Sequence, residues 1–427
     1  MKFQILARFC YFFTLCLLLL PPLSAAAAGR VCDVRQHGAK GDGTTKDTLA
    51  IQAAADECAH AGGGTVRLSG GTFLSAPIVL RSHITLELAA GGVLLGSPDH
   101  DDYPAKTEFR SPGRKSLVSA TDAEDVAITG SGVIDGNGES WWIEARRFKD
   151  AGILGSEHTR PRLVVFDHCH HVRVEGVTLQ NSPMWQLVPY NSDDVVIRNI
   201  RVLAPEKSPN TDAVNPFSSS NVVIDHVFAD VGDDNIAIKS GAINSPGGDL
   251  PSKNIRITNV DFRHGHGLSI GSEIAGGVQN VSVEHARFRG TDNGIRIKAN
   301  RDRGNDVSGI HFNDIQMEDV KTALILSEYY PGVLPSEDIA SAPVTRLTPH
   351  FHDIVIENVT ATATKNAGAI AGLPEAPIQG VTLRNVSIHA PIGFTIGYAT
   401  VVTENFSIHV PAGEAITKLP GASLQNR

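Results

Sequence analysis

Short runs of alternating apolar and polar residues fill most of the chain, and one phrase recurs among them. The phrase is seven residues long, with Asn or Asp first, apolar residues at its second, fourth and seventh positions, and Asn, Gly or His at its sixth. Its copies recur at intervals of mostly about 23 to 33 residues, with one gap of about 44. Clear copies begin at Asp194, Asn221, Asn254, Asp353 and Gly380, and weaker copies begin at His171, Asn280 and Gly309. An interval of this length is typical of one coil of a solenoid.

The content of each repeat indicates which solenoid forms. The segments between copies contain β-branched runs separated by Gly, Asn, Asp and Pro, without helical periodicity. We therefore predict an all-β fold, a single-stranded, right-handed parallel β-helix whose coils bury apolar side chains inside the tube and pair with one another at about 4.8 Å. Because no coil can bury its core alone, residues 29–427 should form one elongated domain, although this length would otherwise suggest two or three.

Two segments interrupt the repeats. Residues 47–62, DTLAIQAAADECAHAG, predict a short amphipathic helix with Asp47 or Thr48 as its N-cap, followed by the glycines at 62 to 64. We expect this helix to cap the N-terminal end of the solenoid and shield its strand edges. Residues 328–350 carry no strand pattern and predict an irregular loop beside the site.

The first 28 residues have the pattern of a secretory signal peptide. Lys2 and Arg8 precede an apolar run over residues 9–20, which is followed by two prolines and the small residues 24–28. The alternative, an uncleaved membrane anchor, is disfavoured because a run of about twelve apolar residues is shorter than the roughly twenty that span a bilayer. We therefore predict a secreted protein, extracellular or in transit through a periplasm, with no membrane association after cleavage.

Three cysteines remain after removal of the signal peptide. In an oxidising compartment, Cys32 and Cys58 are the expected disulfide pair, since the bond would tie the new N-terminus to the predicted helix. Cys169 is then a buried free thiol. A metal site at Cys169 is disfavoured because neighbouring side chains of a strand point to opposite faces. The histidines considered for that site are His168, His170 and His171.

Composition limits the partners of the protein. The formal net charge is −9 and no long basic run is present, which argues against a nucleic-acid partner. Any polyanionic ligand would therefore have to be held by local positive charge. We expect no cofactor and no metal, and a monomer.

Four short strings between residues 210 and 298 carry the candidate chemistry. They are Asn210-Thr211-Asp212, Gly232-Asp233-Asp234, Gly265-His266-Gly267 and Arg296-Ile297-Lys298. Each is associated with a short apolar alternation that predicts a strand with one buried face. Counting back two residues from the first buried position of each strand gives Asp212, Asp234, His266 and Asn293, so these positions should stack on adjacent coils.

Such stacking would place two or three carboxylates within several ångströms of one another. Like charges at this distance cannot all ionise freely, so the pKa of one carboxyl must rise. A carboxyl with a raised pKa suits a general acid that protonates a leaving sugar oxygen, while the others activate water. Arg296 and Lys298 should point outward together, with Arg301 and Arg303 close behind, and this local positive charge would select a uronic-acid polymer.

The four strings together resemble the polygalacturonases, the inverting pectin-cleaving enzymes of glycoside hydrolase family 28. They read NTDAV, GDDNIAIKSG, GHGLSIGSE and NGIRIKAN in the family's order, and the resemblance runs from about Val31 to near the C-terminus. It implies a pectin-lyase-like solenoid that hydrolyses α-1,4 linkages of polygalacturonate or pectin.

The resemblance also implies roles for individual residues. Asp233 would be the general acid, Asp212 and Asp234 would activate the water, and His266 would tune the protonation of the acid. The resemblance implies that Asn210, Arg296 and Lys298 contact the substrate. It also implies a contact from either Tyr329 or Tyr330, of which we name Tyr330. One departure is Asn215, where many relatives carry Asp, and it bears on subsite preference.

Other functions stay open at this point. With no large N-terminal extension and no long insertion before Asn210, the sequence favours a groove open at both ends and hence internal cleavage. An exo-acting enzyme or a rhamnogalacturonan hydrolase is the alternative, because loops decide this property. More remote alternatives are a non-catalytic polysaccharide-binding β-helix and a calcium-dependent lyase.

Overall fold

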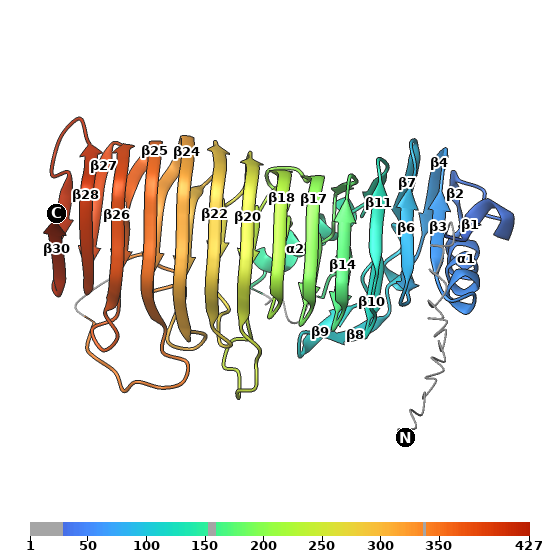
Figure 1. Ribbon diagram of the computed structural model, residues 1–427, viewed down its shortest axis with the longest axis horizontal. Helices are drawn as coiled ribbons and strands as arrows, with labels where there is room; N and C mark the ends of the chain where they lie inside the picture. The colour runs from blue at the N-terminus through green and yellow to red at the C-terminus, as the bar shows by residue number, and fades with distance from the viewer. Residues whose placement is uncertain (1–28, 153–158, 336–338) are drawn as a thin grey trace, which may run out of the picture.

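The computed structural model describes residues 29–427 except 153–158 and 336–338, so the expected signal peptide lies outside the described residues. The described chain winds into an elongated solenoid of parallel strands, as Figure 1 shows. Every ladder of its large sheets is parallel, and among the described strands the hairpin β8–β9 (Ala105–Glu108 and Ser111–Arg114) is the antiparallel pair. The predicted parallel β-helix is confirmed.

Three strand ladders run along the solenoid. The first joins β1 (Val31–Asp33), β3 (Gly64–Leu68), β6 (Ile84–Leu88), β11 (Ala127–Gly130), β14 (His170–Glu175), β17 (Asp193–Leu203), β18 (Ser220–Asp230), β20 (Ser252–Phe262), β22 (Val278–Arg289), β24 (Asp306–Ser327), β25 (His350–Ala371), β26 (Ile378–His389), β28 (Ala399–His409) and β30 (Ala422–Asn426). The second joins β2 (Asp42–Lys46), β4 (Gly71–Ser75), β7 (Gly92–Gly96), β12 (Val133–Asp135) and β15 (Thr178–Gln180), and it merges with the first in the long strand β17.

The third ladder positions the site described below. It begins with β5 (Ile78–Leu80), β10 (Val118–Thr121), β13 (Val164–Asp167) and β16 (Leu187–Tyr190), and it continues through β19 (Ile236–Ile238), β21 (Leu268–Ile270), β23 (Asn293–Lys298), the ends of β24 and β25, β27 (Ile392–Gly397) and β29 (Ile416–Lys418). Val214 connects the two parts by single bridges to Leu187 and to Ile236. The third ladder therefore forms one continuous face along the molecule.

The recurring phrase lies within the strands of the first ladder and begins with a residue in a left-handed backbone conformation near the start of each strand. Asn221, Asn254 and Asn280 each have a positive φ near 55°, a conformation that Asn tolerates better than most residues. Their side-chain amides also stack, since Asn254 Nδ2 donates to Asn221 Oδ1 at 3.0 Å and Asn280 Nδ2 donates to Asn254 Oδ1 at 2.8 Å. The repeat thus combines a residue in a left-handed conformation with a cross-coil hydrogen bond, which explains why the position is polar in a strand-rich sequence.

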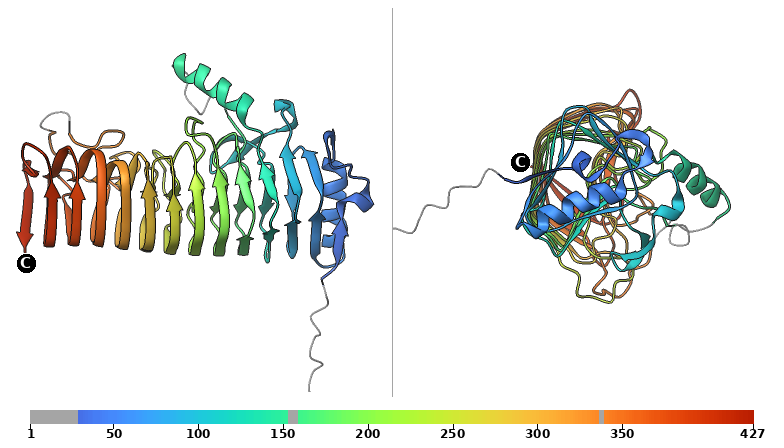
Figure 2. Two further views of the ribbon diagram at one scale, coloured as in Figure 1. Left: turned by 90° about the horizontal axis from the view of Figure 1, so that it is seen from above. Right: turned by 90° about the vertical axis from the view of Figure 1, so that its right-hand side faces the viewer.

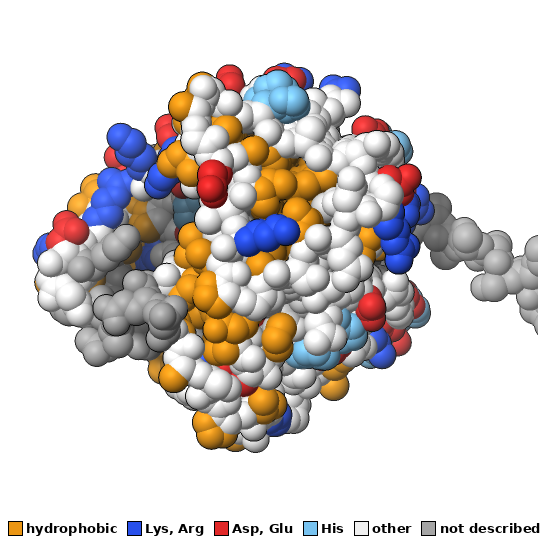
Figure 3. Space-filling view, turned by 90° about the vertical axis from the view of Figure 1, so that its left-hand side faces the viewer, with side chains coloured by type: hydrophobic (Ala, Val, Ile, Leu, Met, Phe, Trp, Pro, Cys, Tyr) orange, Lys and Arg blue, Asp and Glu red, His pale blue; other side chains and the backbone are white. Residues whose placement is uncertain are grey.

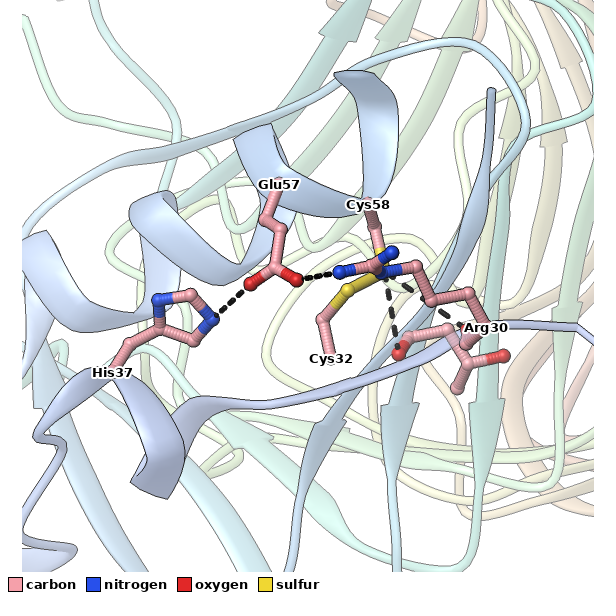
Figure 4. Close-up of a disulfide and its surroundings, with 6 residues drawn as sticks. Arg30, Cys32, His37, Glu57 and Cys58 are labelled. Atoms are coloured by element: carbon pink, nitrogen blue, oxygen red, sulfur yellow. Dashed lines mark hydrogen bonds and ion pairs between the residues drawn. A yellow bond between two sulfur atoms is a disulfide. The ribbon is translucent and has the colours of Figure 1, made fainter. Parts of the chain in front are cut away.

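The predicted helix caps the N-terminal end. The helix α1 (Thr48–His60) follows the N-cap position Asp47 and covers the end of the tube with Ile51 and other buried residues, and Figure 2 shows it lying across that end. Cys58 of α1 forms the expected disulfide with Cys32 of β1, beside the ion pairs that Glu57 makes with Arg30 and His37, as Figure 4 shows. Cys169 is buried and free.

The opposite end of the solenoid is less well covered. Phe406, Ile408, Ile416 and Leu424 pack against the core but stay partly exposed, and Figure 3 shows hydrophobic side chains gathered on this end. Residues 328–349 form no strand where the structure describes them, as expected for the loop. Within the described residues no helix combines the length and apolar character that a membrane span requires.

A second helix was not predicted from the sequence. The helix α2 (Glu139–Asp150) projects from the side of the solenoid in Figure 2. Its first turn attaches it, because Trp141 stacks on His100 with ring centroids 3.4 Å apart and Trp142 Nε1 donates to Ser182 O at 2.9 Å. Ile143 is exposed, and beyond the first turn no described side chain of the helix is fully buried.

A carboxyl group is buried where β24 ends. Glu328 is 0% exposed, its Oε2 accepts from Leu373 N at 2.8 Å, and its Oε1 has no hydrogen-bond partner among the described atoms. Burial raises the pKa of Glu328 well above its usual range, so the folded protein holds this group neutral. Above the pKa of the unfolded chain, unfolding releases that proton, and the contribution of Glu328 to stability therefore falls as pH rises.

Glu328→Gln should accordingly flatten the dependence of stability on pH. We expect the melting temperature of the wild type to fall more between pH 5 and pH 8 than that of Glu328→Gln, measured by thermal unfolding followed by circular dichroism. Glu375→Gln is a matched control, because the pKa of Glu375 is lowered by its bonds to Arg301 despite burial. An identical loss of melting temperature in the wild type and Glu328→Gln would contradict a neutral buried carboxyl.

Candidate active site

The four strings of the sequence come together on the third ladder. Val214 bridges Ile236, which pairs with Leu268, which in turn pairs with Ile295. These are the apolar positions from which the register was counted, so the predicted register is confirmed. The residues two positions earlier therefore stack on four successive coils, and they are Asp212, Asp234, His266 and Asn293.

Glycines allow the coils to approach closely at this place. A Cβ atom on Gly232 would lie 2.2 Å from Ser208 O, and one on Gly267 would lie 2.0 Å from Asn293 O. Gly267 also has a φ of 79°, which side chains disfavour. A side chain at either glycine would collide with the backbone of the adjacent coil. The glycines therefore allow the close packing that fixes the positions of Asp233 and His266.

Asp234 lies at the centre of the positive charge. It is 2% exposed, Lys298 Nζ donates to its Oδ2 at 3.0 Å, and Arg296 Nη2 donates to its Oδ1 at 2.5 Å. Ser269 Oγ also donates to Oδ1 at 2.8 Å. Burial alone would raise the pKa of Asp234, but the charges of Lys298 and Arg296 outweigh it and hold the pKa well below its usual range. Asp234 is therefore a permanent anion in the free protein.

Asp212 has the opposite environment. It is 3% exposed, and burial together with the negative charges of Asp233 and Asp234 raises its pKa. Asn215 Nδ2 donates a hydrogen bond to Asp212 Oδ2 at 2.8 Å. The sequence predicted that one carboxyl of the cluster would have a raised pKa, and the structure assigns that shift to Asp212.

Asp233 and His266 form a pair at the more exposed edge of the cluster. His266 Nδ1 lies 3.0 Å from Asp233 Oδ1, and the side chain of Asp233 is 21% exposed. Burial opposes a charge on His266, but its bond to Asp233 and the nearby carboxylates outweigh this effect and raise its pKa. Asp292 lies on the other side of the ring, with its Oδ2 3.5 Å from His266 Nε2. Asp233 is thus a carboxyl that a ligand can reach, next to an imidazole whose pKa is raised.

The other expected substrate contacts lie on both sides of this cluster. Asn210 is exposed, and its Oδ1 accepts from Arg160 Nη2 at 2.6 Å. The Tyr330 ring centroid lies 5.4 Å from Lys298 Nζ, whereas Tyr329 turns its hydroxyl to donate to Gly372 O at 2.6 Å. Of the two tyrosines, Tyr330 is therefore the one that faces Lys298.

The structure corrects the expected cluster of four cations. Arg301 is bound to Glu375 by two hydrogen bonds of 2.6 and 3.0 Å, and Arg303 Nε lies 2.7 Å from Asp302 Oδ1. Glu375 is far from Arg301 in the sequence, whereas Asp302 is adjacent to Arg303. Because both cations are paired with carboxylates, counting cations in the sequence overstated the local positive charge.

Three residues beside the carboxyl cluster were not predicted from the sequence, and they are Lys239, Arg160 and Ser269. Lys239 forms a buried ion pair with Glu273 at 2.9 Å and lies 5.1 Å from the Trp185 ring centroid. Arg160 fixes Asn210, and Ser269 donates to Asp234 as described above. One signal could have revealed Lys239, because IAIK of the second string has the same spacing as IRIK of the fourth. No comparable pattern marks Arg160 or Ser269.

A metal ion would compete with these contacts. Asp233, Asp234 and His266 each offer one ligand atom, and these atoms lie within 4.8 Å of one another. Both oxygens of Asp234 already accept bonds from Lys298, Arg296 or Ser269, so a cation would have to displace them. The donor set fits proton transfer between carboxyl groups and water better than it fits a metal centre.

Asn215 offers a test of the raised pKa of Asp212. In Asn215→Asp, a carboxylate replaces the amide that donates to Asp212, so the pKa of Asp212 should rise further or the new carboxyl should take up a proton. We expect the acid limb of the pH profile of kcat/KM to move to higher pH, measured on polygalacturonate. A melting temperature equal to that of the wild type would show that the variant is folded. An unchanged acid limb in a folded variant would show that Asp212 does not control activity.

Comparison with known proteins places these features in a family. Residues 94–407 match the model of glycosyl hydrolases family 28. The chain is 33% identical to a probable polygalacturonase of Vitis vinifera over 82% of this chain and 73% of the relative. It is 30% identical to an endo-polygalacturonase of Pectobacterium carotovorum subsp. carotovorum over 85% of this chain and 89% of the relative.

A solved structure shows the same fold. The hyperthermoactive exopolygalacturonase of Thermotoga maritima superposes with a TM-score of 0.74 and 28% sequence identity, covering 88% of this chain and 92% of the other. Enzymes with both endo and exo in their names are therefore among the proteins that this chain resembles.

Proposed function

The chain belongs to glycosyl hydrolase family 28, the polygalacturonase family, and from this premise we propose that it is an endo-acting polygalacturonase. It would hydrolyse α-1,4 linkages between galacturonic acid residues of pectin or polygalacturonate, with inversion. The observation that carries the proposal is the stack of Asp212, Asp233 and Asp234 beside two cations on a single face. A site of this kind combines groups for proton transfer with groups that bind a carboxylate.

The environments of the three carboxyls support their roles. We propose that Asp233 gives its proton to the leaving glycosidic oxygen, because it is the carboxyl that a substrate can reach and His266 lies beside it. Asp234 stays ionised between Lys298 and Arg296, so it can accept a bond from the attacking water. Asp212 would take the proton of that water together with Asp234, once substrate binding has moved the proton that Asp212 holds in the free protein to Asp233. Inversion follows when water attacks from the face opposite to the acid.

One proton is shared within this cluster near neutral pH. The raised pKa of Asp212 places the proton there in the free protein, and adjacent carboxyls titrate as a coupled set. If the carboxylate of a bound substrate draws Lys298 or Arg296 towards itself, the distribution of this proton among the three carboxyls would change. Comparing the pH profiles of Asp212→Asn and Asp233→Asn tests which carboxyl holds the proton during turnover.

Cavities on both sides of the catalytic coils support internal cleavage. On the N-terminal side a cavity of about 450 Å³ lies against α2 and is lined in part by Asp135, Asn181 and Pro205. On the C-terminal side a cavity of about 340 Å³ includes Tyr329 and Tyr398. A polysaccharide that occupies both must pass across Asp233, which is what an endo-acting enzyme requires.

The deciding experiment is incubation of the purified protein with polygalacturonic acid in EDTA, following reducing ends, ultraviolet absorbance and product length. We expect new reducing ends without ultraviolet absorbance, as a ladder of oligomers. Release of single sugars or of one short product alone would indicate exo action. Absorbance that depends on calcium would indicate a lyase, and binding without new reducing ends would indicate a polysaccharide-binding protein.

We further propose that the protein acts after export, as a monomer. The signal-like pattern of residues 1–28 and the Cys32–Cys58 disulfide support an oxidising compartment. Detection of the mature chain, beginning near residue 29, in the culture medium or periplasm would test the location, and size-exclusion chromatography would test the oligomeric state.

A further inference from the structure

We propose that Asp306, His350 and His352 form a binding site for one zinc ion on the first ladder, outside the catalytic face. Asp306 is the first residue of β24 and pairs with His350, the first residue of β25. Each of the three side chains offers one ligand atom, and these atoms lie within 4.8 Å of one another. The ion would join the starts of two neighbouring strands, so its role is structural.

Strand alternation turns the two imidazoles to the same side. His350 and His352 are two positions apart in β25, and Phe351 between them is fully buried in the core. The two imidazole centroids lie 4.6 Å apart. His350 Nδ1 lies 3.6 Å from Asp306 Oδ1, and His352 Nε2 lies 2.7 Å from the same oxygen. No metal was expected from the sequence, where Asp306 and His352 are 46 positions apart.

Neighbouring side chains hold two of the ligands in place. His352 Nδ1 lies 2.7 Å from Asp353 Oδ2, which is the kind of contact that orients metal-binding imidazoles. Ser308 Oγ donates to Asp306 Oδ2 at 2.7 Å, and Gln279 Nε2 donates to the same oxygen at 3.3 Å. These bonds occupy Oδ2, so Oδ1 is the oxygen of Asp306 that faces the two histidines.

A metal ion matches this arrangement better than a proton does. When His352 donates its Nδ1–H to Asp353, its Nε2 carries a lone pair that faces the lone pairs of Asp306 Oδ1. A proton between these two atoms makes one hydrogen bond and leaves His350 outside it. A metal ion can accept a lone pair from all three atoms. The ligand atoms of a tetrahedral zinc ion are about 3.4 Å apart, which lies between the 2.7 and 3.6 Å found here.

The donor set also selects among cations. Two imidazole nitrogens and one carboxylate oxygen suit zinc, whereas calcium and magnesium prefer oxygen ligands. The His350 side chain is 52% exposed, so an ion can enter from solvent and water can complete its coordination. The catalytic cluster differs, because Lys298, Arg296 and Ser269 already donate to both oxygens of Asp234. The zinc site is therefore independent of the catalytic residues and goes beyond the proposed function.

Zinc titration of the protein tests the site directly. The protein is purified without a polyhistidine tag, stripped with EDTA, freed of EDTA and titrated with zinc chloride by isothermal titration calorimetry. We expect one zinc ion per chain and no comparable binding of calcium. His350→Ala removes a ligand and should weaken zinc binding by at least about 100-fold. Asp353→Asn removes the carboxylate that orients His352 and should weaken it by about tenfold.

A second pair of stacked histidines provides the matched control. The rings of His389 and His409 lie 4.3 Å apart on adjacent strands, and within the described part of the chain no third ligand atom joins them. His389→Ala should therefore bind zinc like the wild type. Zinc should also raise the melting temperature of the wild type and of His389→Ala, but not that of His350→Ala.

Three results would overturn the inference. They are the absence of zinc binding in the wild type, zinc binding by His350→Ala as tight as that of the wild type, and an equal loss in His389→Ala. Zinc held by the catalytic cluster would survive in His350→Ala, so the second result covers that case. The readout is metal binding, and the hydrolysis assay in EDTA reports separately on the proposed function.

Discussion

Asp233→Asn should lower kcat on polygalacturonate by about 10³-fold or more while leaving KM and the melting temperature nearly unchanged. General acid catalysis contributes typically 10²- to 10⁴-fold, and breaking a glycosidic bond without protonating the leaving oxygen removes this contribution entirely. Asn has almost the same shape as Asp, and its side-chain oxygen can still accept from Asp234 N, which donates to Asp233 Oδ1 at 2.9 Å. The measurement is steady-state release of reducing ends, with calorimetric binding of oligogalacturonate to the variant.

The control for this variant is the carboxylate on the opposite side of His266. Asp292 lies 3.5 Å from His266 Nε2 and pairs with Lys321, so Asp292→Asn perturbs the same imidazole without removing the proposed acid. We expect it to lower kcat far less than Asp233→Asn does. Comparable losses in the two variants would show that both act through His266, and retained activity in Asp233→Asn would end its assignment as the acid.

The sequence predicted the solenoid because the relevant signals are local. Each coil repeats an apolar alternation next to a residue in a left-handed conformation, and Asn221 or Asn254 needs only its own backbone conformation and its neighbour one coil away. The register of the catalytic strings followed from the same alternation, since one slipped residue would turn Ile236 outward. Fold and stacking order were therefore readable without knowledge of any long-range contact.

The parts that escaped prediction depend on pairings between distant residues. Arg301 looked like a free cation until the structure placed Glu375 against it, 74 positions later in the chain. Tyr329 and Tyr330 are adjacent and chemically identical, so only the path of the backbone decides which one faces Lys298. The helix α2 is held by two tryptophans of its first turn, and one of them, Trp142, bonds to Ser182, 40 positions later in the chain.

The depth of each carboxyl was also beyond the sequence, although it determines the chemistry. Asp212, Asp233 and Asp234 are equivalent as residue types, yet one is buried with a raised pKa and another is buried with a lowered pKa. The difference comes from Lys298 and Arg296, which reach Asp234 from two coils away. The same pair of cations must also meet the carboxylate of the proposed substrate, so it serves the catalytic group and the ligand together.

Lys298→Ala should therefore damage both binding and catalysis. The Lys298 Nζ is bonded to a buried carboxylate at 3.0 Å, and removing one partner of such a pair typically costs 2 to 5 kcal/mol, which is about 30- to 5,000-fold in kcat/KM. Loss of this charge should also raise the pKa of Asp234, so the acid limb of the pH profile should move to higher pH. Initial rates across pH on polygalacturonate measure both effects.

An exposed lysine on the next coil separates this expectation from a general effect of charge. Lys321 pairs with Asp292 and its side chain is 59% exposed, so Lys321→Ala removes the same charge from the same molecule where solvent screens it. We expect kcat/KM of Lys321→Ala to stay within about twofold of the wild type, because exposed ion pairs contribute little. If Lys298→Ala behaved like Lys321→Ala, the cation would lie outside the binding subsite. A loss of activity with an unmoved acid limb would instead mean that Arg296 alone keeps Asp234 ionised and that Lys298 serves only the substrate.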